Sequence, residues 1–116
     1  MLRMTLFTLA LLVATPAYAG PACQTLAAAE AETAAESQKL GGEVIRLSGY
    51  QAHQYLDVVN EVPPQTHLDA EQVMLLVIPE RGAVIGLIES SNVCIAGHIG
   101  AAVHERALKA ARGLSA

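Results

Sequence analysis

Four histidines supply the side chains best suited to metal binding or acid–base chemistry: His53, His67, His98 and His104. Histidine is the commonest protein ligand for metals, and zinc-binding pairs have short local spacings such as H-E-x-x-H on one helix. His98 and His104 are six residues apart, so a shared helix places them on different faces. His104 precedes Glu105, but the second histidine of a zinc-binding helix is missing. A small metal-dependent enzyme using His98, His104 and Glu105 is therefore the weaker hypothesis, and we expect no cofactor.

Nucleophilic and paired-carboxylate chemistry find little support in the sequence. Ser90 and Ser91 follow Glu89 in a predicted turn, and no G-x-S-x-G motif accompanies them. Asp57 and Glu61 are four residues apart on a predicted helix, where carboxylates usually face water. We therefore assign no catalytic residue.

Two cysteines, Cys23 and Cys94, are the remaining reactive side chains. An even number of cysteines in an exported chain favours a disulfide. A bridge between them closes a loop of about 70 residues, which stabilises the fold by about 4 kcal/mol on the chain-entropy estimate. A reactive thiol needs nearby cations or a helix N-terminus, and the sequence around Cys94 has neither.

The N-terminus has the three parts of a secretory signal peptide. A basic tip containing Arg3 precedes the apolar run Met4–Ala14, and Ala17 and Ala19 form an A-x-A cleavage site. We predict cleavage after Ala19 and a periplasmic or secreted location. The apolar run is shorter than the roughly 20 residues of a membrane-spanning helix, which argues against an uncleaved anchor. A lipidated Cys23 is a further alternative, although the large aliphatic residue expected three positions before it is missing.

The charge of the chain argues against nucleic acid and anionic membrane surfaces as partners. The full chain has a formal net charge of −4, and loss of Arg3 with the signal peptide leaves −5. Both kinds of partner require clustered basic residues. The one basic group, Arg106, Lys109 and Arg112, is typical of the last turns of a helix, where cations complement the helix dipole.

A hydrophobic stretch near the middle of the chain, about residues 73–97, predicts a three-stranded antiparallel meander. Its strands are Val73–Ile78, Ala83–Glu89 and Val93–Ala96, separated by turns rich in Pro, Gly, Ser and Asn. The first strand is apolar on both faces, so we expect it to be covered on both sides or to lie centrally in the sheet.

Helices are predicted at about residues 23–40, 49–61 and 98–112, with a further strand at 43–47. Ser48 is the expected N-cap of the second helix, and Pro63-Pro64 ends that helix. The fold class is therefore α+β, a small sheet with helices packed mainly on one face. If the strands flanking the second helix are parallel, that helix is a right-handed crossover. We divide the chain into a signal peptide (1–19), an N-terminal helix (20–41) and a single small domain (42–114).

Several residues, together with their spacing, resemble a known group of proteins. The residues are Tyr55-Leu56, Asn60, Pro63-Pro64, Thr66, Asp69-Ala70 and Val73, followed by a hairpin and a strand bearing Cys94. Over roughly residues 43–112 the chain resembles uncharacterised small exported proteins of proteobacteria. The resemblance implies export and this order of elements, and it implies no catalytic residues.

These observations favour a non-enzymatic exported protein that binds a protein partner or a small ligand. A structural component of the cell envelope is the alternative from another class. Aromatic anchors are scarce after the signal peptide, where Tyr50 and Tyr55 remain; Tyr50 is the exposed candidate and Tyr55 is expected in the core. The apolar sheet also favours self-association through a strand edge.

Overall fold

The computed structural model describes residues 23–113, so the predicted signal peptide lies outside the described residues. The domain is α+β, as predicted, with a five-stranded antiparallel sheet and three helices. In chain order the elements are β1 (Cys23–Thr25), α2 (Leu26–Leu40), β2 (Glu43–Ser48), α3 (Tyr50–Glu61), β3 (Gln72–Ile78), β4 (Gly82–Glu89), β5 (Asn92–Ile99) and α4 (Ala101–Ala111).

The sheet has the order β1-β5-β4-β3-β2, and every neighbouring pair is antiparallel. The predicted meander is present as β3, β4 and β5, and β5 extends to Ile99 rather than ending at Ala96. β2 pairs directly with β3, with Ile45 opposite Leu75. The connection through α3 is therefore not a parallel crossover, because it joins antiparallel neighbours.

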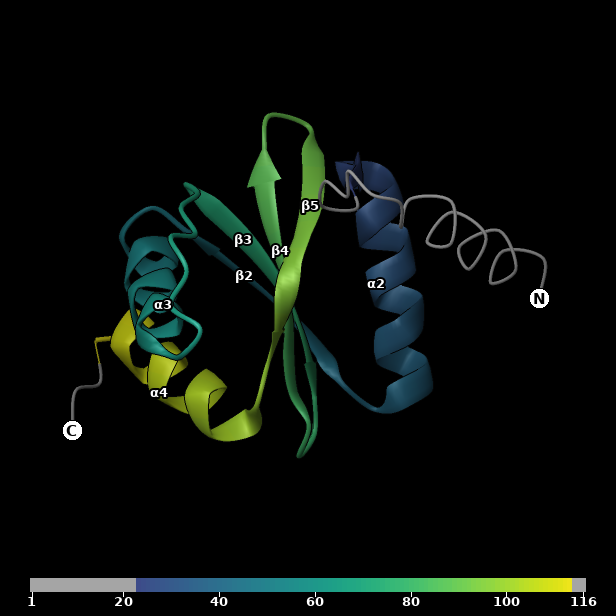
Figure 1. The fold of residues 1–116 in the computed structure, drawn as a ribbon. Helices are drawn as coiled ribbons and strands as arrows, with labels where there is room; N and C mark the ends of the chain where they lie inside the picture. Colours follow the sequence, from purple (N-terminus) through teal and green to yellow (C-terminus); the bar gives the residue numbers. More distant parts are fainter. Residues whose placement is uncertain (1–22, 114–116) are drawn as a thin grey trace.

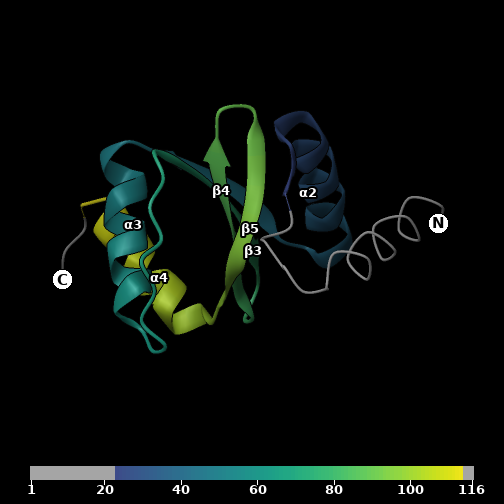
Figure 2. The same ribbon diagram turned by 45° about the horizontal axis from the view of Figure 1, so that its top comes forward.

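The helices form a layer on each face of the sheet. α3 and α4 lie together on one face, and α2 lies on the other (Figures 1 and 2). The expectation that the helices pack mainly on one face holds for α3 and α4, whereas α2 covers the opposite face. Residues of β3 alternate between the two layers, because successive side chains of a strand point to opposite faces. Val73 and Leu75 belong to the core under α3 and α4, and Met74 belongs to the cluster under α2.

The main core lies between the sheet and the α3–α4 layer. Its largest fully buried side chains are Tyr55, Leu56, Val73, Leu75 and Ile85. Burying each large aliphatic side chain contributes about 1.5–3 kcal/mol. This core therefore supplies most of the hydrophobic stabilisation.

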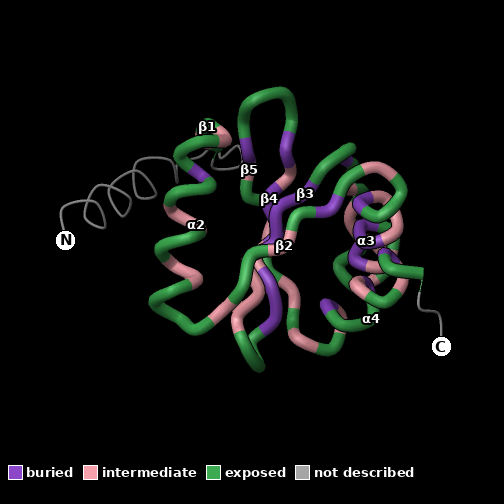
Figure 3. Tube along the Cα trace, turned by 180° about the vertical axis from the view of Figure 1, so that it is seen from behind, coloured by how far each residue is buried: buried purple, intermediate pink, exposed green. Residues whose placement is uncertain are grey.

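The α2 layer is packed more thinly than the α3–α4 layer. Its cluster contains Ala29, Met74, Ile88 and Val93, with Leu26 beside it, and Ala29 is the one fully buried residue of the helix. Figure 3 shows α2 mostly exposed or half-buried along its length. The apolar side chains of α2 are mostly alanine, so the helix buries little apolar area.

Polar and covalent contacts hold the start of α2 to the sheet. The Cys23–Cys94 disulfide is present, as predicted, and links β1 to β5. Thr25 caps the helix by accepting a hydrogen bond from the backbone N–H of Ala28. The backbone N–H of Leu26 donates to the carbonyl oxygen of Ser91.

Two glycines, Gly49 and Gly82, have positive φ angles that other residues rarely adopt. Gly49, not the predicted Ser48, is the N-cap of α3, and its φ of 58° lies in the left-handed region. Gly82 begins β4 with a φ of 109°, and a Cβ at this position would overlap the carbonyl oxygen of Ile99. The β3–β4 turn therefore depends on glycine for both conformation and space.

A β-bulge interrupts the pairing of β4 with β5. Ile85 pairs with Gly97 and Gly86 pairs with Ile95, so Ala96 is the additional residue on β5.

None of the helices within residues 23–113 has the length and hydropathy of a membrane span.

Candidate functional site

His104 lies in the interior of the domain, on the inner face of α4. It is 6 % exposed, and its Nδ1 lies 2.8 Å from the hydroxyl oxygen of the fully buried Tyr55 on α3. The two rings meet edge to face, with centroids 5.8 Å apart. This pair joins the two helices of one layer.

Burial determines the protonation of both partners. Burial raises the pKa of Tyr55, so its hydroxyl keeps its hydrogen. Burial also lowers the pKa of His104, while Glu105 and Glu43 oppose that shift and Arg112 adds to it. We therefore assign the bond as the Tyr55 hydroxyl donating to the unprotonated Nδ1 of a neutral imidazole. The hydroxyl of Tyr55 and Nδ1 of His104 therefore each have a hydrogen-bond partner in the interior of the domain.

His98 and His104 are not brought together by the fold. His98 lies in β5, not in the final helix, because that helix begins at Ala101 rather than at residue 98. Its neighbour Ile99 packs against the main core, so His98 points to the α2 face of the sheet, whereas His104 and Ile99 share the other face. Glu105 is exposed on α4. Within residues 23–113, no group of three or more His, Cys, Asp or Glu side chains has a geometry that could hold a metal ion.

His53, on α3, lies between two carboxylates that precede β3. Its Nδ1 is 3.3 Å from Asp69 and its Nε2 is 3.2 Å from Glu71. The two ring nitrogens point in different directions, so the two carboxylates approach the ring from different sides. All three groups are well exposed to solvent. The arrangement ties the loop before β3 to α3, and His67 in the same loop is exposed.

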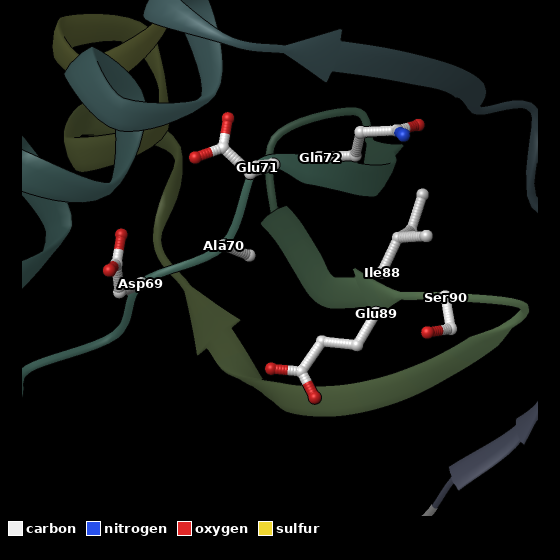
Figure 4. Close-up of a pocket in the computed structure, with 7 residues that line it drawn as sticks. All are labelled: Asp69, Ala70, Glu71, Gln72, Ile88, Glu89 and Ser90. Carbon is white, nitrogen blue, oxygen red and sulfur yellow. The ribbon is translucent and has the colours of Figure 1, made fainter.

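A shallow hollow of about 370 Å³ lies where β3 begins and β4 ends. Its lining includes the acidic residues Asp69, Glu71 and Glu89, beside Ile88 and Ser90. Figure 4 shows the three carboxylates spread around the hollow, without converging on one point. This geometry does not assemble a catalytic group.

The two edges of the sheet differ in how they are protected. At one edge, β1 pairs with Asn92–Cys94, and the bulge at Ala96 interrupts the rest of β5. Bulges and short covering strands both hinder the addition of a further strand. At the other edge, β2 pairs with β3 over all six of its residues without a register shift, and no described strand lies on its outer side.

Several exposed large apolar side chains lie in β2 or next to its ends in the sequence. Within the described residues the exposed ones are Leu40, Val44, Tyr50 and Ile95, at 39 %, 39 %, 69 % and 41 %. Leu40 ends α2 just before β2, Val44 lies in β2, and Tyr50 begins α3 just after it. One of the four therefore lies in β2 and two lie beyond its two ends, whereas Ile95 lies in β5 at the protected edge.

Arg46 lies on the α2 face of β2, and contacts within the chain hold its side chain against that face. The Arg46 guanidinium forms an ion pair with Glu30 of α2 at 2.9 Å and donates a hydrogen bond to Gln72 of β3 at 3.1 Å. Both partners belong to this chain, so the arginine is drawn toward α2 and β3. The candidate functional site is thus the β2 edge, defined by Glu43–Ser48 with Leu40 and Tyr50.

Sequence reasoning identified part of this site. Tyr50 was the predicted exposed aromatic, and the strand at 43–47 was expected, but the sequence did not show that this strand lies at the edge. Edge position depends on the order of the strands, which no local pattern encodes. Comparisons with protein-family models, with curated proteins and with solved structures found no match to this chain.

Proposed function

We propose that this chain is an exported, non-enzymatic protein that binds a protein partner by strand addition at the β2 edge. The observation that carries the proposal is the outer side of β2, on which no described strand pairs, with the exposed Val44 in the strand and the exposed Leu40 and Tyr50 beyond its ends. In strand addition, main-chain hydrogen bonds supply affinity, and the flanking side chains supply specificity.

The flanking residues suit this mode of binding. Tyr50 offers a large amphipathic ring, and tyrosine is enriched among residues that dominate binding energies. Val44 offers apolar area on the same face of β2 as Arg46, and Leu40 offers apolar area at the end of α2. An added strand would cover these side chains and pair the exposed backbone groups.

Export is supported by the signal-peptide features of the first 19 residues and by the Cys23–Cys94 disulfide. Disulfides persist in oxidising compartments and are rare in the cytosol. We therefore propose the periplasm or the extracellular space as the location. An enzyme using His98, His104 and Glu105 is not proposed. His98 points to the α2 side of the sheet, whereas His104 lies on the α3–α4 side.

Site-specific photo-crosslinking in the natural host tests the proposal. A photoreactive amino acid placed at position 44 is expected to give a covalent adduct in the exported fraction. The same group at position 95, equally exposed at the protected edge, is the matched control and is expected to give little or none. Absence of an adduct at 44, or equal yields at both positions, would contradict the proposed function.

A further inference from the structure

We propose that the partner at the β2 edge is a second copy of this chain, so that two five-stranded sheets join into one continuous sheet about a twofold axis. This inference rests on the proposed function and assigns its occupant. A twofold axis perpendicular to the sheet places the same strand of each copy side by side and antiparallel, as an isologous interface requires.

The alternation of side chains restricts the register of such a pair. Residues directly opposite each other in an antiparallel pair have their side chains on the same face. In β2, Glu43, Ile45 and Leu47 face the α3–α4 layer, while Val44 and Arg46 face the α2 layer. The axis must therefore pass through a residue paired with its own symmetry mate, since any other register would place opposite faces together.

Length and charge then select among the allowed registers. Axes at Ile45 and Arg46 pair five residues of each β2 strand, which is more than any other allowed axis pairs. An axis at Arg46 would place two guanidinium groups directly opposite each other, which is unfavourable. An axis at Ile45 instead places Val44 opposite Arg46 of the second copy and Glu43 opposite Leu47 of the second copy. This register pairs residues 43–47 of both strands, and it puts no two like charges opposite each other.

The charge composition of the edge supports a second copy as the occupant. Outside the signal peptide the chain is acidic overall, so most surfaces of two copies repel each other. β2 carries one acidic and one basic residue, Glu43 and Arg46, and is therefore locally neutral. The strand itself therefore adds no net charge to an interface between two copies, in contrast to the acidic remainder of the chain.

Sedimentation velocity on the purified, signal-free, oxidised protein tests this inference with two substitutions at one position. Val44→Glu places a carboxylate opposite Arg46 of the second copy, so the dimer dissociation constant is expected to fall by about fivefold. Val44→Lys places an ammonium group there, so the constant is expected to rise by a similar factor. Ile95→Glu and Ile95→Lys are matched controls at the other edge, and we expect them to leave association unchanged.

The outcomes separate the two proposals. Opposite shifts for Val44→Glu and Val44→Lys support the second copy in this register. A wild-type protein that remains monomeric at high concentration, or two variants that shift in the same direction, overturns it. If the protein is monomeric while position 44 crosslinks to a different protein, the proposed function stands and the second copy does not. If position 44 gives no adduct at all, the proposed function fails as well.

Discussion

The hydroxyl of Tyr55 donates a hydrogen bond to Nδ1 of His104 over 2.8 Å, and this contact joins α3 to α4 across 49 residues of sequence. Both partners are buried, so the bond forms in a medium of low dielectric constant, where an unpaired polar group is costly. The pair adds a polar contact between α3 and α4 to the hydrophobic core that these helices share with the sheet.

Removal of the Tyr55 hydroxyl is therefore expected to destabilise the domain. Tyr55→Phe leaves Nδ1 of His104 without its donor, and the free energy of unfolding should fall by about 1–3 kcal/mol. Urea denaturation followed by circular dichroism measures the change. Tyr50→Phe, at an exposed position, is the control and should change stability by less than about 0.5 kcal/mol. Equal effects at the two tyrosines would show that the buried hydrogen bond contributes nothing.

The stability of the domain is expected to fall as the pH drops below the ordinary histidine pKa of 6.5. Burial lowers the pKa of His104 in the folded state, so between the folded and unfolded pKa values the unfolded chain binds more protons. This contribution is fully present above pH 6.5 and is lost progressively until the pH reaches the folded pKa. The groups that modulate the shift are Glu105 and Glu43, which oppose it, and Arg112, which adds to it.

Two measurements check this pH dependence. An NMR titration of the imidazole protons should give His104 an apparent pKa below 6.5. Urea unfolding at several pH values should show a steeper decline below pH 6.5 in the wild type than in His104→Gln. An NMR pKa at or above 6.5 would contradict the predicted direction.

Loss of the disulfide is expected to cost much of the stability of the domain. Cys23 and Cys94 are 71 residues apart, and the chain-entropy relation gives about 4 kcal/mol for a loop of that length. The double variant Cys23→Ser, Cys94→Ser should therefore unfold at much lower urea concentration than the oxidised wild type. Reduction of the wild type under mild conditions should reproduce the shift. A loss below about 1 kcal/mol would show that the loop is already restricted in the unfolded chain.

Gly82→Ala is expected to destabilise the β3–β4 turn strongly. The added Cβ would overlap the carbonyl oxygen of Ile99, and a φ of 109° is unfavourable for alanine. We expect a loss of about 2 kcal/mol or more, measured by thermal unfolding. Gly100→Ala is the matched control, because a Cβ there meets no atom within 4 Å and φ is −73°. Similar losses at both glycines would contradict the steric account.

The sequence predicted the elements with strong periodicity and missed those that depend on distant partners. β3 and β4 follow from apolar runs rich in Val, Ile and Leu, bounded by turn residues, although Gly86 interrupts the run of β4. β1 was expected to be helical, because three residues cannot show a strand period and its partner β5 lies about 70 residues away. The end of β5 was missed because Gly97 and His98 interrupt its apolar run.

The candidate site shows the same division. Tyr50 is exposed and Tyr55 is buried, as predicted, and the burial of Tyr55 follows from its place in the apolar stripe of the helix. The contact of Tyr55 with His104 was not predictable, because it joins two helices that the sequence separates. The position of β2 at an open edge depends on the strand order, which only the assembled sheet reveals.

Amide hydrogen exchange at two protein concentrations tests most directly the claim that a second copy of this chain pairs along the β2 edge. Those backbone amides of Glu43–Ser48 that point away from β3 should exchange more slowly at high than at low concentration, because a second β2 strand would accept their hydrogen bonds. Amides of Ile95–Ile99 at the other edge should exchange at the same rate in both samples. Absence of concentration-dependent protection at 43–48, whether or not residues 95–99 become protected, would contradict this claim.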